Sequence, residues 1–433
     1  MDNIGPKVKQ NSPERANPPQ IGRFWPAPWV HRMIRPMKRG QRLTLTASRV
    51  AESGSGIAVV GDRHVSVDGL APGETGEVEI ESVSRHHRRA FARLLGRGQP
   101  PCPQRQEPAC PGFGRCGGCA WQHLGYDTQL EHKRLRVVDA LEGLVESKRI
   151  PSAKPAPSEL HYRNKGTYVL GRRENDLIVG ARIPRSAELI DTRGCKVVER
   201  PIDEVAVRFA NLVQDRSLPV DQGPGSLRYL LMRSGADGRL VVGIATWGPA
   251  LDWMPALATT LAEHAAVASI VHIANDRTSG AVLGPQPPES LIGPGTVGDR
   301  FGSVPVQIAI DSFVQVNRAQ TATLYGQVAA WAQGAGATRA IDLYCGLGGI
   351  AFVLGDAGLD VTGVERSADA ERAQAAATAA GKSNVSFIRG DAGIAATPDA
   401  DFVVVNPPRK GLSAEARAVV VNTAAPLLAY LSC

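Results

Sequence analysis

The stretch "IDLYCGLGGIAFVLGDAGLDVTGVER", residues 341–366, decides the fold of the C-terminal part of the chain. An apolar run, a glycine-rich turn, a helical run and a second apolar run follow one another and end near Glu365. In doubly wound sheets, ligands approach the backbone at such a turn, and an acid about 20 residues later accepts hydrogen bonds from ribose hydroxyls. The glycines do not complete G-x-G-x-x-G. The pattern therefore favours S-adenosylmethionine, which has a ribose but no phosphate, over a dinucleotide.

The residues around this stretch continue the alternation of strand and helix. Apolar runs at "RAIDLYC", "LDVTGVE", "VSFI", "DFVVVN" and "LLAYLSC" are separated by helical runs, and "NRAQTATLYGQVAAWA" (317–332) precedes them as a further helix. Continuous apolar strands joined by helices are typical of a parallel sheet. We therefore predict an α/β, Rossmann-like domain over residues 311–433.

A second motif in this domain is "DFVVVNPPRKG", residues 401–411. It follows the fourth predicted strand, at the sheet edge where ligands bind, and two prolines fix the backbone beside Asn406. In amino-group methyltransferases an aromatic residue follows N-P-P and stacks on the base. Here Arg409 follows instead. Amino-group methylation is therefore kept as an alternative function and is not the leading prediction.

Three further regions precede this domain. Residues 41–98 alternate apolar and polar side chains with period two, which predicts a small OB-like β-barrel of five short strands, a frequent nucleic-acid binder. Residues 99–310 contain many short apolar runs with glycine breaks and predict a mixed α+β central domain. Residues 1–40 are rich in proline and predict a disordered tail.

Charge and hydropathy limit the class of protein. The chain has 433 residues and a net charge of +7, with eight Lys or Arg and two acids in residues 1–40. Residues 84–98 add five Arg and two His without an acid. Two basic runs on either side of one small domain favour contact with a nucleic-acid backbone. No apolar run reaches the roughly 18 residues of a membrane span, and no apolar signal segment opens the chain, so we expect a cytoplasmic protein.

The cysteines are clustered. Cys110, Cys116 and Cys119 have C-x5-C-x2-C spacing, and Cys195 in "TRGCKVVERP" is a possible fourth ligand. Zinc sites more often contain two C-x2-C pairs, whereas three close thiolates and a distant one suit a [4Fe–4S] cluster better. The spacing differs from the C-x3-C-x2-C of radical enzymes, and Cys102 has no assigned role.

Together these motifs resemble the RNA uracil-5-methyltransferases, in the branch that acts on 23S ribosomal RNA. The resemblance runs through "VSVDGLAPGETGEVEI", "CPGFGRCGGCAWQHLGYDTQLEHKR", "SFVQVNRAQTATLY", "DLYCGLGG" and "YLSC". It implies a TRAM RNA-binding barrel, a [4Fe–4S] cluster on the four cysteines, a class I methyltransferase domain and a monomer that acts on ribosomal RNA. Many members have Asp where this chain has Asn406, but one ribosomal subgroup carries Asn-Pro-Pro-Arg. The residues implied to contact S-adenosylmethionine are Gln315, Tyr344, Gly349, Glu365, Asp391 and Asn406.

The resemblance also makes Cys433 the catalytic nucleophile. Its thiolate would add to uracil C6, C5 would then take the methyl group, and a base would remove the C5 proton. In the family, the chain continues past this cysteine into a His-Val-Glu segment that carries the base. We therefore expect this chain to be C-terminally truncated and to turn over poorly, and we assign no general base. A catalytically impaired RNA-binding fragment is the alternative from another class, and an iron–sulfur electron carrier is weaker still.

Overall fold

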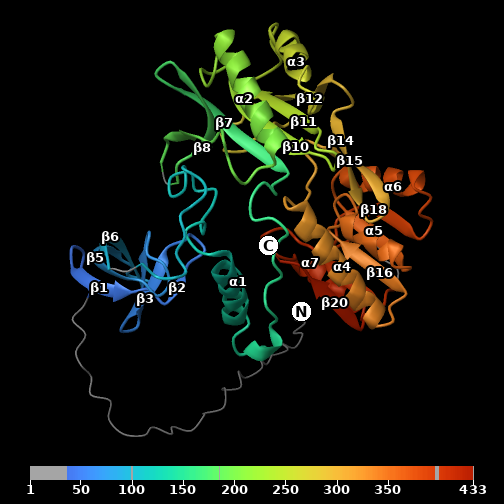
Figure 1. The fold of residues 1–433 in the computed structure, drawn as a ribbon. Coiled ribbons are helices and arrows are strands. Elements are labelled where there is room, and N and C mark those ends of the chain that lie inside the picture. The colour runs from blue at the N-terminus through green and yellow to red at the C-terminus, as the bar shows by residue number, and fades with distance from the viewer. Residues whose placement is uncertain (1–36, 99–100, 185, 395–398, 433) are drawn as a thin grey trace, which may run out of the picture.

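The computed structural model describes residues 37–98, 101–184, 186–394 and 399–432. Three β-sheets of six, seven and five strands follow one another along the chain, and a two-stranded hairpin lies between the second and the third. Figure 1 shows the small N-terminal sheet separated from the other two by the helix α1 (Tyr126–Ala140) and the loop before it.

The N-terminal sheet has the strand order β1-β5-β6-β4-β3-β2. Its two edge strands, β1 and β2, are separated only by Ala47 and Ser48. The Ala47 amide donates to the Glu74 carbonyl, and the Ser48 amide donates to the Ile57 carbonyl. This single bent segment therefore closes the sheet into a barrel-like form. It also makes six strands where the sequence predicted five: β1 (Arg42–Thr46), β2 (Arg49–Val50), β3 (Gly56–Val60), β4 (Arg63–Val67), β5 (Thr75–Val83) and β6 (Arg89–Arg97).

The central sheet confirms the mixed α+β prediction. Its order is β13-β12-β11-β10-β7-β8-β9, and all its pairs are antiparallel except β11 with β12. Its strands and helices, apart from the short η1 (Ser147–Arg149), are β7 (Lys165–Arg173), β8 (Asp176–Arg182), β9 (Leu189–Asp191), α2 (Arg200–Asp215), β10 (Leu227–Ser234), β11 (Leu240–Thr246), α3 (Met254–Ala262), β12 (Val267–Ala274) and β13 (Glu289–Ile292).

Helix α2 covers one face of the central sheet because its apolar residues recur at helical spacing. Ile202, Val205, Phe209 and Val213 are all buried in one cluster with residues of β10 and β11. The proline at its start is well placed, since its missing N–H would have no partner inside the helix.

The C-terminal sheet is parallel, as the sequence predicted, with the order β18-β17-β16-β19-β20. Buried residues of α4, α5 and α6 pack on one face of it, and Ala416 of α7 packs on the other. The order in which strands are added reverses at β16: β17 and β18 lie on one side of it, and β19 and β20 lie on the other. The parallel neighbours β16 and β19 therefore form the switch point where α/β sheets bind ligands. The elements are α4 (Arg318–Gly334), β16 (Arg339–Leu343), α5 (Gly349–Asp356), β17 (Asp360–Glu365), α6 (Asp369–Ala379), β18 (Val385–Arg389), β19 (Phe402–Val405), α7 (Ala414–Asn422) and β20 (Leu427–Tyr430).

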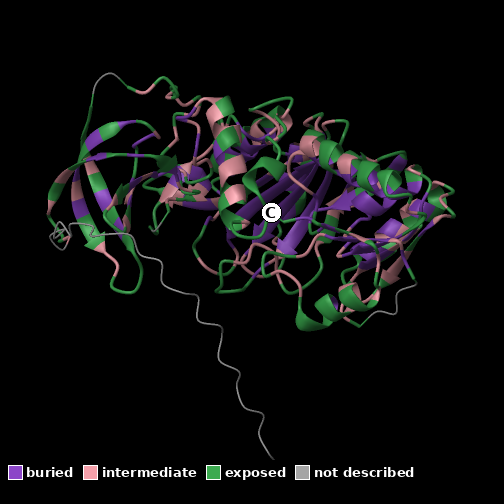
Figure 2. Ribbon diagram, turned by 90° about the horizontal axis from the view of Figure 1, so that it is seen from below, coloured by how far each residue is buried: buried purple, intermediate pink, exposed green. Residues whose placement is uncertain are grey.

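The hairpin of β14 (Thr296–Phe301) and β15 (Val304–Ala309) packs against the C-terminal sheet's helices. Its buried valines join the same apolar cluster as α5 and α6. Figure 2 shows the buried residues concentrated along the strands of the central and C-terminal sheets. In the described ranges, no helix has both the length and the apolar character needed to cross a membrane.

Candidate functional site

The site lies at the carboxyl ends of β16, β17 and β19, where the sequence placed it. A cavity of about 760 Å³ opens there, which we call the sheet-edge cavity. It falls within the roughly 300–1,000 Å³ range of small-molecule pockets. Five of the six residues expected to contact the cofactor line it, namely Gln315, Tyr344, Glu365, Asp391 and Asn406.

Glu365 is positioned by backbone amides. Its carboxylate accepts a hydrogen bond of 3.2 Å from the Gly346 N–H and one of 2.7 Å from the Ser367 N–H. A carboxylate has about four acceptor positions, so it can accept further hydrogen bonds from ligand hydroxyls. Asp391 is fixed in a similar way, because its Oδ1 accepts a hydrogen bond of 2.9 Å from the Gly393 N–H.

The turn after β16 has an unusual backbone. Tyr344 adopts φ +63°, a left-handed conformation that is uncommon for a residue other than glycine. Gly348 follows with φ +79°, and a Cβ there would lie 2.5 Å from the ring of Phe387. Strained backbone of this kind costs about 1–3 kcal/mol and clusters at ligand-binding sites. The left-handed conformation of Tyr344 and the absence of a Cβ at Gly348 therefore set the shape of the turn that borders the cavity.

Gly349 is the expected cofactor contact that does not line the cavity. It is the first residue of α5 and is buried. A Cβ at this position would lie 2.7 Å from the ring of Tyr325 on α4. The glycine thus permits close packing of α4 on α5, a contact between segments that the local sequence pattern does not show.

A hydrogen-bonded network holds the segment that carries Gln315 against the cavity. Ser312 donates to Asp369 at 2.8 Å, and Arg372 donates to the same carboxylate at 2.7 Å. From the central sheet, buried Arg233 donates to the Ser312 carbonyl. Sequence reasoning did not find this network, because its members come from three distant segments.

Phe313 is the other prominent residue of this segment. It lines the cavity, and its side chain stays 65% exposed. An exposed aromatic ring at a cavity mouth can stack on a flat ligand. The sequence contained the residue within "SFVQVN", but its exposure depends on the fold.

Two buried groups lie beneath the turn. Burial raises the pKa of Asp342 to about 8, although a hydrogen bond from the Ala351 N–H opposes the shift. Burial also raises the pKa of the Cys345 thiol well above its usual value. Cys345 is therefore a packing residue in the thiol form. Asp342 was not singled out from the sequence, although its place near the end of β16 was a usable signal.

The four clustered cysteines also meet in space. Cys110, Cys116, Cys119 and Cys195 line one cavity of about 260 Å³, the four-thiol cavity. Burial raises the pKa values of the Cys116 and Cys119 thiols, and Cys195 and Cys110 add to both shifts. Cys102 lies elsewhere, in a cavity between the barrel and the loop.

The four thiols do not form a site for a single ion. Across the described ranges, no three His, Cys, Asp or Glu side chains are arranged to hold one metal ion. A mononuclear zinc site requires sulfurs about 2.3 Å from a common centre. The four thiols border one hollow of about 260 Å³.

Cys433, the expected nucleophile, lies outside the described residues. The preceding strand β20 runs parallel to β19, with Tyr430 paired to Val405. The Leu431 amide then donates to the Val405 carbonyl. The described chain therefore reaches the same sheet edge at which Asn406 follows β19.

A parallel sheet of this order, with a ligand-sized cavity at its switch point, is the arrangement in which doubly wound α/β domains bind ligands. No protein-family model matches the chain. It is 30% identical over 414 residues to an uncharacterised RNA methyltransferase of Halalkalibacterium halodurans, covering 92% of this chain and 89% of the relative. An uncharacterised RNA methyltransferase of Clostridium tetani is 29% identical over 416 residues, covering 92% and 88%.

One solved structure shares the fold over most of the chain. It is the Pyrococcus abyssi tRNA (uracil-54, C5)-methyltransferase in complex with S-adenosyl-L-homocysteine. The TM-score is 0.70 at 23% identity, and the match covers 91% of this chain and 90% of that one. On the similarity to the Halalkalibacterium relative, the chain belongs to the RNA methyltransferases.

Proposed function

We propose that the protein methylates uridine C5 in RNA with S-adenosylmethionine as methyl donor, and that its substrate is 23S ribosomal RNA. The observation that carries the proposal is the sheet-edge cavity, which brings five expected cofactor-contacting residues together from five separate segments. The Pyrococcus abyssi neighbour, whose structure contains S-adenosyl-L-homocysteine, supports the choice of cofactor. We keep the expectation of a monomer that acts in the cytoplasm as part of this proposal.

Different residues of the sheet-edge cavity would bind different parts of the cofactor. Glu365, held by two backbone amides, would accept hydrogen bonds from the ribose hydroxyls. The Asp391 carboxylate would accept hydrogen bonds, and the Asn406 amide would accept or donate them. Their partner would be the polar edge of the cofactor's base or of the target uracil. Gln315 and Tyr344 would close the side of the cavity that faces the incoming RNA.

The chemistry requires a nucleophile, which we assign to Cys433. When bound, S-adenosylmethionine supplies an electrophilic methyl group. Uracil C5 is a poor nucleophile until a thiolate adds to C6 and turns C5 into an enolate carbon. The target uridine must leave its base stack to expose C6. An amide such as that of Asn406 can orient the uracil edge while this occurs.

The four-thiol cavity would hold a [4Fe–4S] cluster on Cys110, Cys116, Cys119 and Cys195. Four sulfurs around one 260 Å³ hollow match the number of cysteine ligands of such a cluster. Bound cluster would keep these thiols deprotonated against the effect of burial. It would also supply folding energy to a loop with little secondary structure of its own.

The six-stranded N-terminal sheet would act as the TRAM barrel and bind the RNA backbone. The strand β6 and the turn before it carry the basic run of residues 84–98. Phe91, Leu95 and Val59 are exposed on this sheet, so aromatic and apolar side chains lie among the arginines. Aromatic side chains in a basic surface are typical of single-strand RNA binders.

A covalent trap tests the function. The protein is mixed with S-adenosylmethionine and ribosomal RNA that contains 5-fluorouridine, and adducts are mapped by mass spectrometry. Fluorine cannot leave as a proton, so a methylated adduct persists without a general base. We expect an adduct on Cys433 that disappears in Cys433→Ala and remains in Cys102→Ala.

Two other outcomes would replace the proposal. Binding of RNA and cofactor without any adduct or methyl transfer would indicate a non-catalytic RNA-binding protein. Methyl transfer to an exocyclic amine that survives Cys433→Ala would indicate amino-group methylation through the Asn406-Pro-Pro segment. The position of Asn406 in the cavity is the observation that keeps this second function in view.

A further inference from the structure

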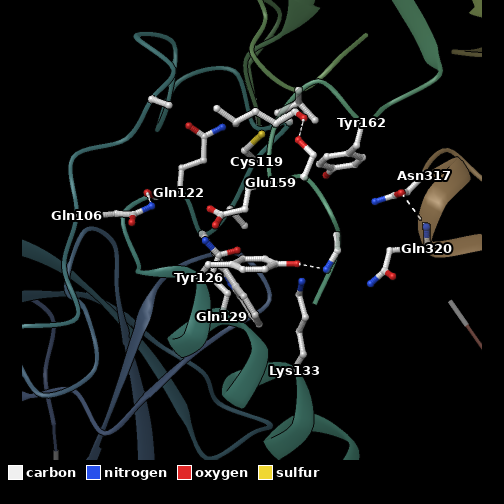
Figure 3. Close-up of a pocket in the computed structure, with 18 of the residues that line it drawn as sticks. Gln106, Cys119, Gln122, Tyr126, Gln129, Lys133, Glu159, Tyr162, Asn317 and Gln320 are labelled. Atoms are coloured by element: carbon white, nitrogen blue, oxygen red, sulfur yellow. Dashed lines mark hydrogen bonds between the residues drawn. The ribbon is translucent and has the colours of Figure 1, made fainter. Parts of the chain in front are cut away.

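A second large cavity lies between α1, the loop that carries Cys119, and the start of α4. Its volume is about 560 Å³, and we call it the α1–α4 cavity. Figure 3 shows Tyr126, Gln129 and Lys133 of α1 on one side of the cavity, and Tyr162, Asn317 and Gln320 on the other. None of these residues was assigned a role by the sequence motifs.

The cavity adjoins both sites described above. Asn317 lines it, and Gln315, two residues earlier, lines the sheet-edge cavity. Two residues of extended chain span at most about 7 Å. On its other side, Cys119 and Val197 line both this cavity and the four-thiol cavity. The α1–α4 cavity and the sheet-edge cavity are therefore bordered by the same short segment, residues 315–317.

The side chains of the cavity combine aromatic rings with amides. Tyr126, Trp121 and Tyr162 line it together with Gln106, Gln122, Gln129, Asn317 and Gln320. Aromatic faces stack on unpaired bases. The amide nitrogens of Gln106, Gln129 and Gln320 already donate to backbone carbonyls. Their amide oxygens are therefore the atoms that can accept hydrogen bonds from a base edge.

The charges of the cavity fit a nucleotide better than a bare anion. Arg136 is paired with Glu52 at 3.2 Å, which leaves Lys133 and Glu159 as the remaining charged groups of the lining. The ammonium of Lys133 lies 5.8 Å from the centre of the Tyr126 ring. One cation, one carboxylate and several amides can bind the phosphate, the imino edge and the carbonyls of a single nucleotide.

We propose that the α1–α4 cavity binds one unstacked nucleotide of the RNA, close along the strand to the nucleotide that enters the sheet-edge cavity. This inference rests on the proposed RNA-directed function. Tyr126 and Tyr162 stack on its base, the amides contact its edge, and Lys133 contacts its phosphate. The loop that carries Cys110, Cys116 and Cys119 forms one wall, so loss of order in that loop also removes this binding site.

The test measures RNA binding without S-adenosylmethionine, so that it does not depend on methyl transfer. Two fluorescein-labelled probes are used, a random-sequence single-stranded RNA of about 12 nucleotides and an abasic ribose–phosphate strand of the same length. Tyr162→Leu should weaken binding of the first probe about fivefold to a hundredfold, which is the range for loss of one stacked base. It should leave binding of the abasic strand unchanged.

Lys133→Met tests the phosphate contact, with Lys148→Met as the matched control. Lys148 lies in η1, is 79% exposed and pairs with Glu146 outside the cavity. Lys133→Met should reduce the slope of log Kd against log salt by about 0.7, the value for one single-strand phosphate. Lys148→Met should leave the slope at its wild-type value.

Equal losses on both probes in Tyr162→Leu, or no loss on either, would overturn the nucleotide site. If Tyr162→Leu does not fold, photo-crosslinking of wild-type protein to RNA containing 4-thiouridine replaces it. We expect crosslinks in residues 126–133 or 156–162, and crosslinks confined to other segments would overturn the proposal. Methyl transfer with unchanged binding in both variants would refute this site alone. Base-dependent binding in this cavity without methyl transfer would refute the proposed catalysis alone.

Discussion

Replacing Glu74 with glutamine should loosen the barrel from the loop that carries Cys110, Cys116 and Cys119. Glu74 lies in the turn before β5, and its side chain is only 2% exposed. Arg105 donates to its Oε2 at 2.7 Å, and the Ala71 N–H donates to the same atom at 2.8 Å. Arg105 also donates to the Gly69 carbonyl at 2.8 Å. This ion pair therefore connects the barrel to the segment that precedes Cys110.

The pKa of Glu74 gives the size of the effect. Burial opposes its ionisation, but the hydrogen bonds from Arg105 and Ala71 outweigh burial and lower the pKa from 4.5 to about 2. This difference corresponds to about 3 kcal/mol of stability at neutral pH. Because the folded pKa is the lower one, the contribution is complete above pH 4.5 and is lost as the pH falls toward 2.

Urea unfolding followed by pulsed hydrogen exchange of barrel peptides measures this contribution. At pH 7, Glu74→Gln should reduce the free energy of barrel unfolding by about 2–3 kcal/mol, and by pH 3 most of the difference from wild type should be gone. Glu79→Gln is the control, because Glu79 forms only longer surface pairs with Arg42 and Arg93 at 3.8 and 3.5 Å. It should change the free energy by less than about 1 kcal/mol. A Glu74→Gln effect that is as small, or that does not depend on pH, would refute the reasoning.

Three further changes test the remaining parts of the site. Gly349→Ala places a Cβ 2.7 Å from the Tyr325 ring and should lower Tm through about 1–3 kcal/mol of overpacking, so an unchanged Tm would contradict the packing role. Asp369→Asn weakens its hold on Ser312 and should raise the Kd for S-adenosylmethionine about threefold to tenfold in calorimetry. An unaltered Kd would show that other contacts position that segment. For the proposed [4Fe–4S] cluster, Cys119→Ser should abolish the iron–sulfur absorbance of the protein and lower its Tm, as a chelator should in wild type. A Tm that neither Cys119→Ser nor the chelator lowers would show that the protein folds without the cluster.

Much of the C-terminal sheet was predictable from the sequence. All five apolar runs became strands, and the glycine turn and Asn406 lie at the edge where strand order reverses. The prediction was possible because a strand in a parallel sheet is apolar along its whole length, and its helices repeat with their own period. The residues after each strand then share one edge by geometry alone.

The barrel and Gly349 show where local patterns were insufficient. The pattern in residues 41–98 predicted alternating strands but treated β1 and β2 as one strand. The break at Ala47 and Ser48 was not predictable, because it depends on pairing with two different partners. Gly349 stood within the glycine motif and was expected at the cofactor. Its position against Tyr325 could be known only after α4 was docked on α5.

The sequence by itself determined the parallel sheet and the C-x5-C-x2-C group of cysteines, since each is encoded by neighbours along the chain. Gln315, Tyr344 and Asp391 were expected only from the resemblance to a known family. Only the tertiary structure decided that the hairpin β14–β15 packs on α5 and α6, and that residues near 120, 160 and 320 enclose the α1–α4 cavity. Spacing between nearby residues follows from the backbone period. Contacts between distant segments depend instead on which of many apolar faces pack together. That arrangement is set by the packing energy of the whole core, and not by any one stretch of sequence.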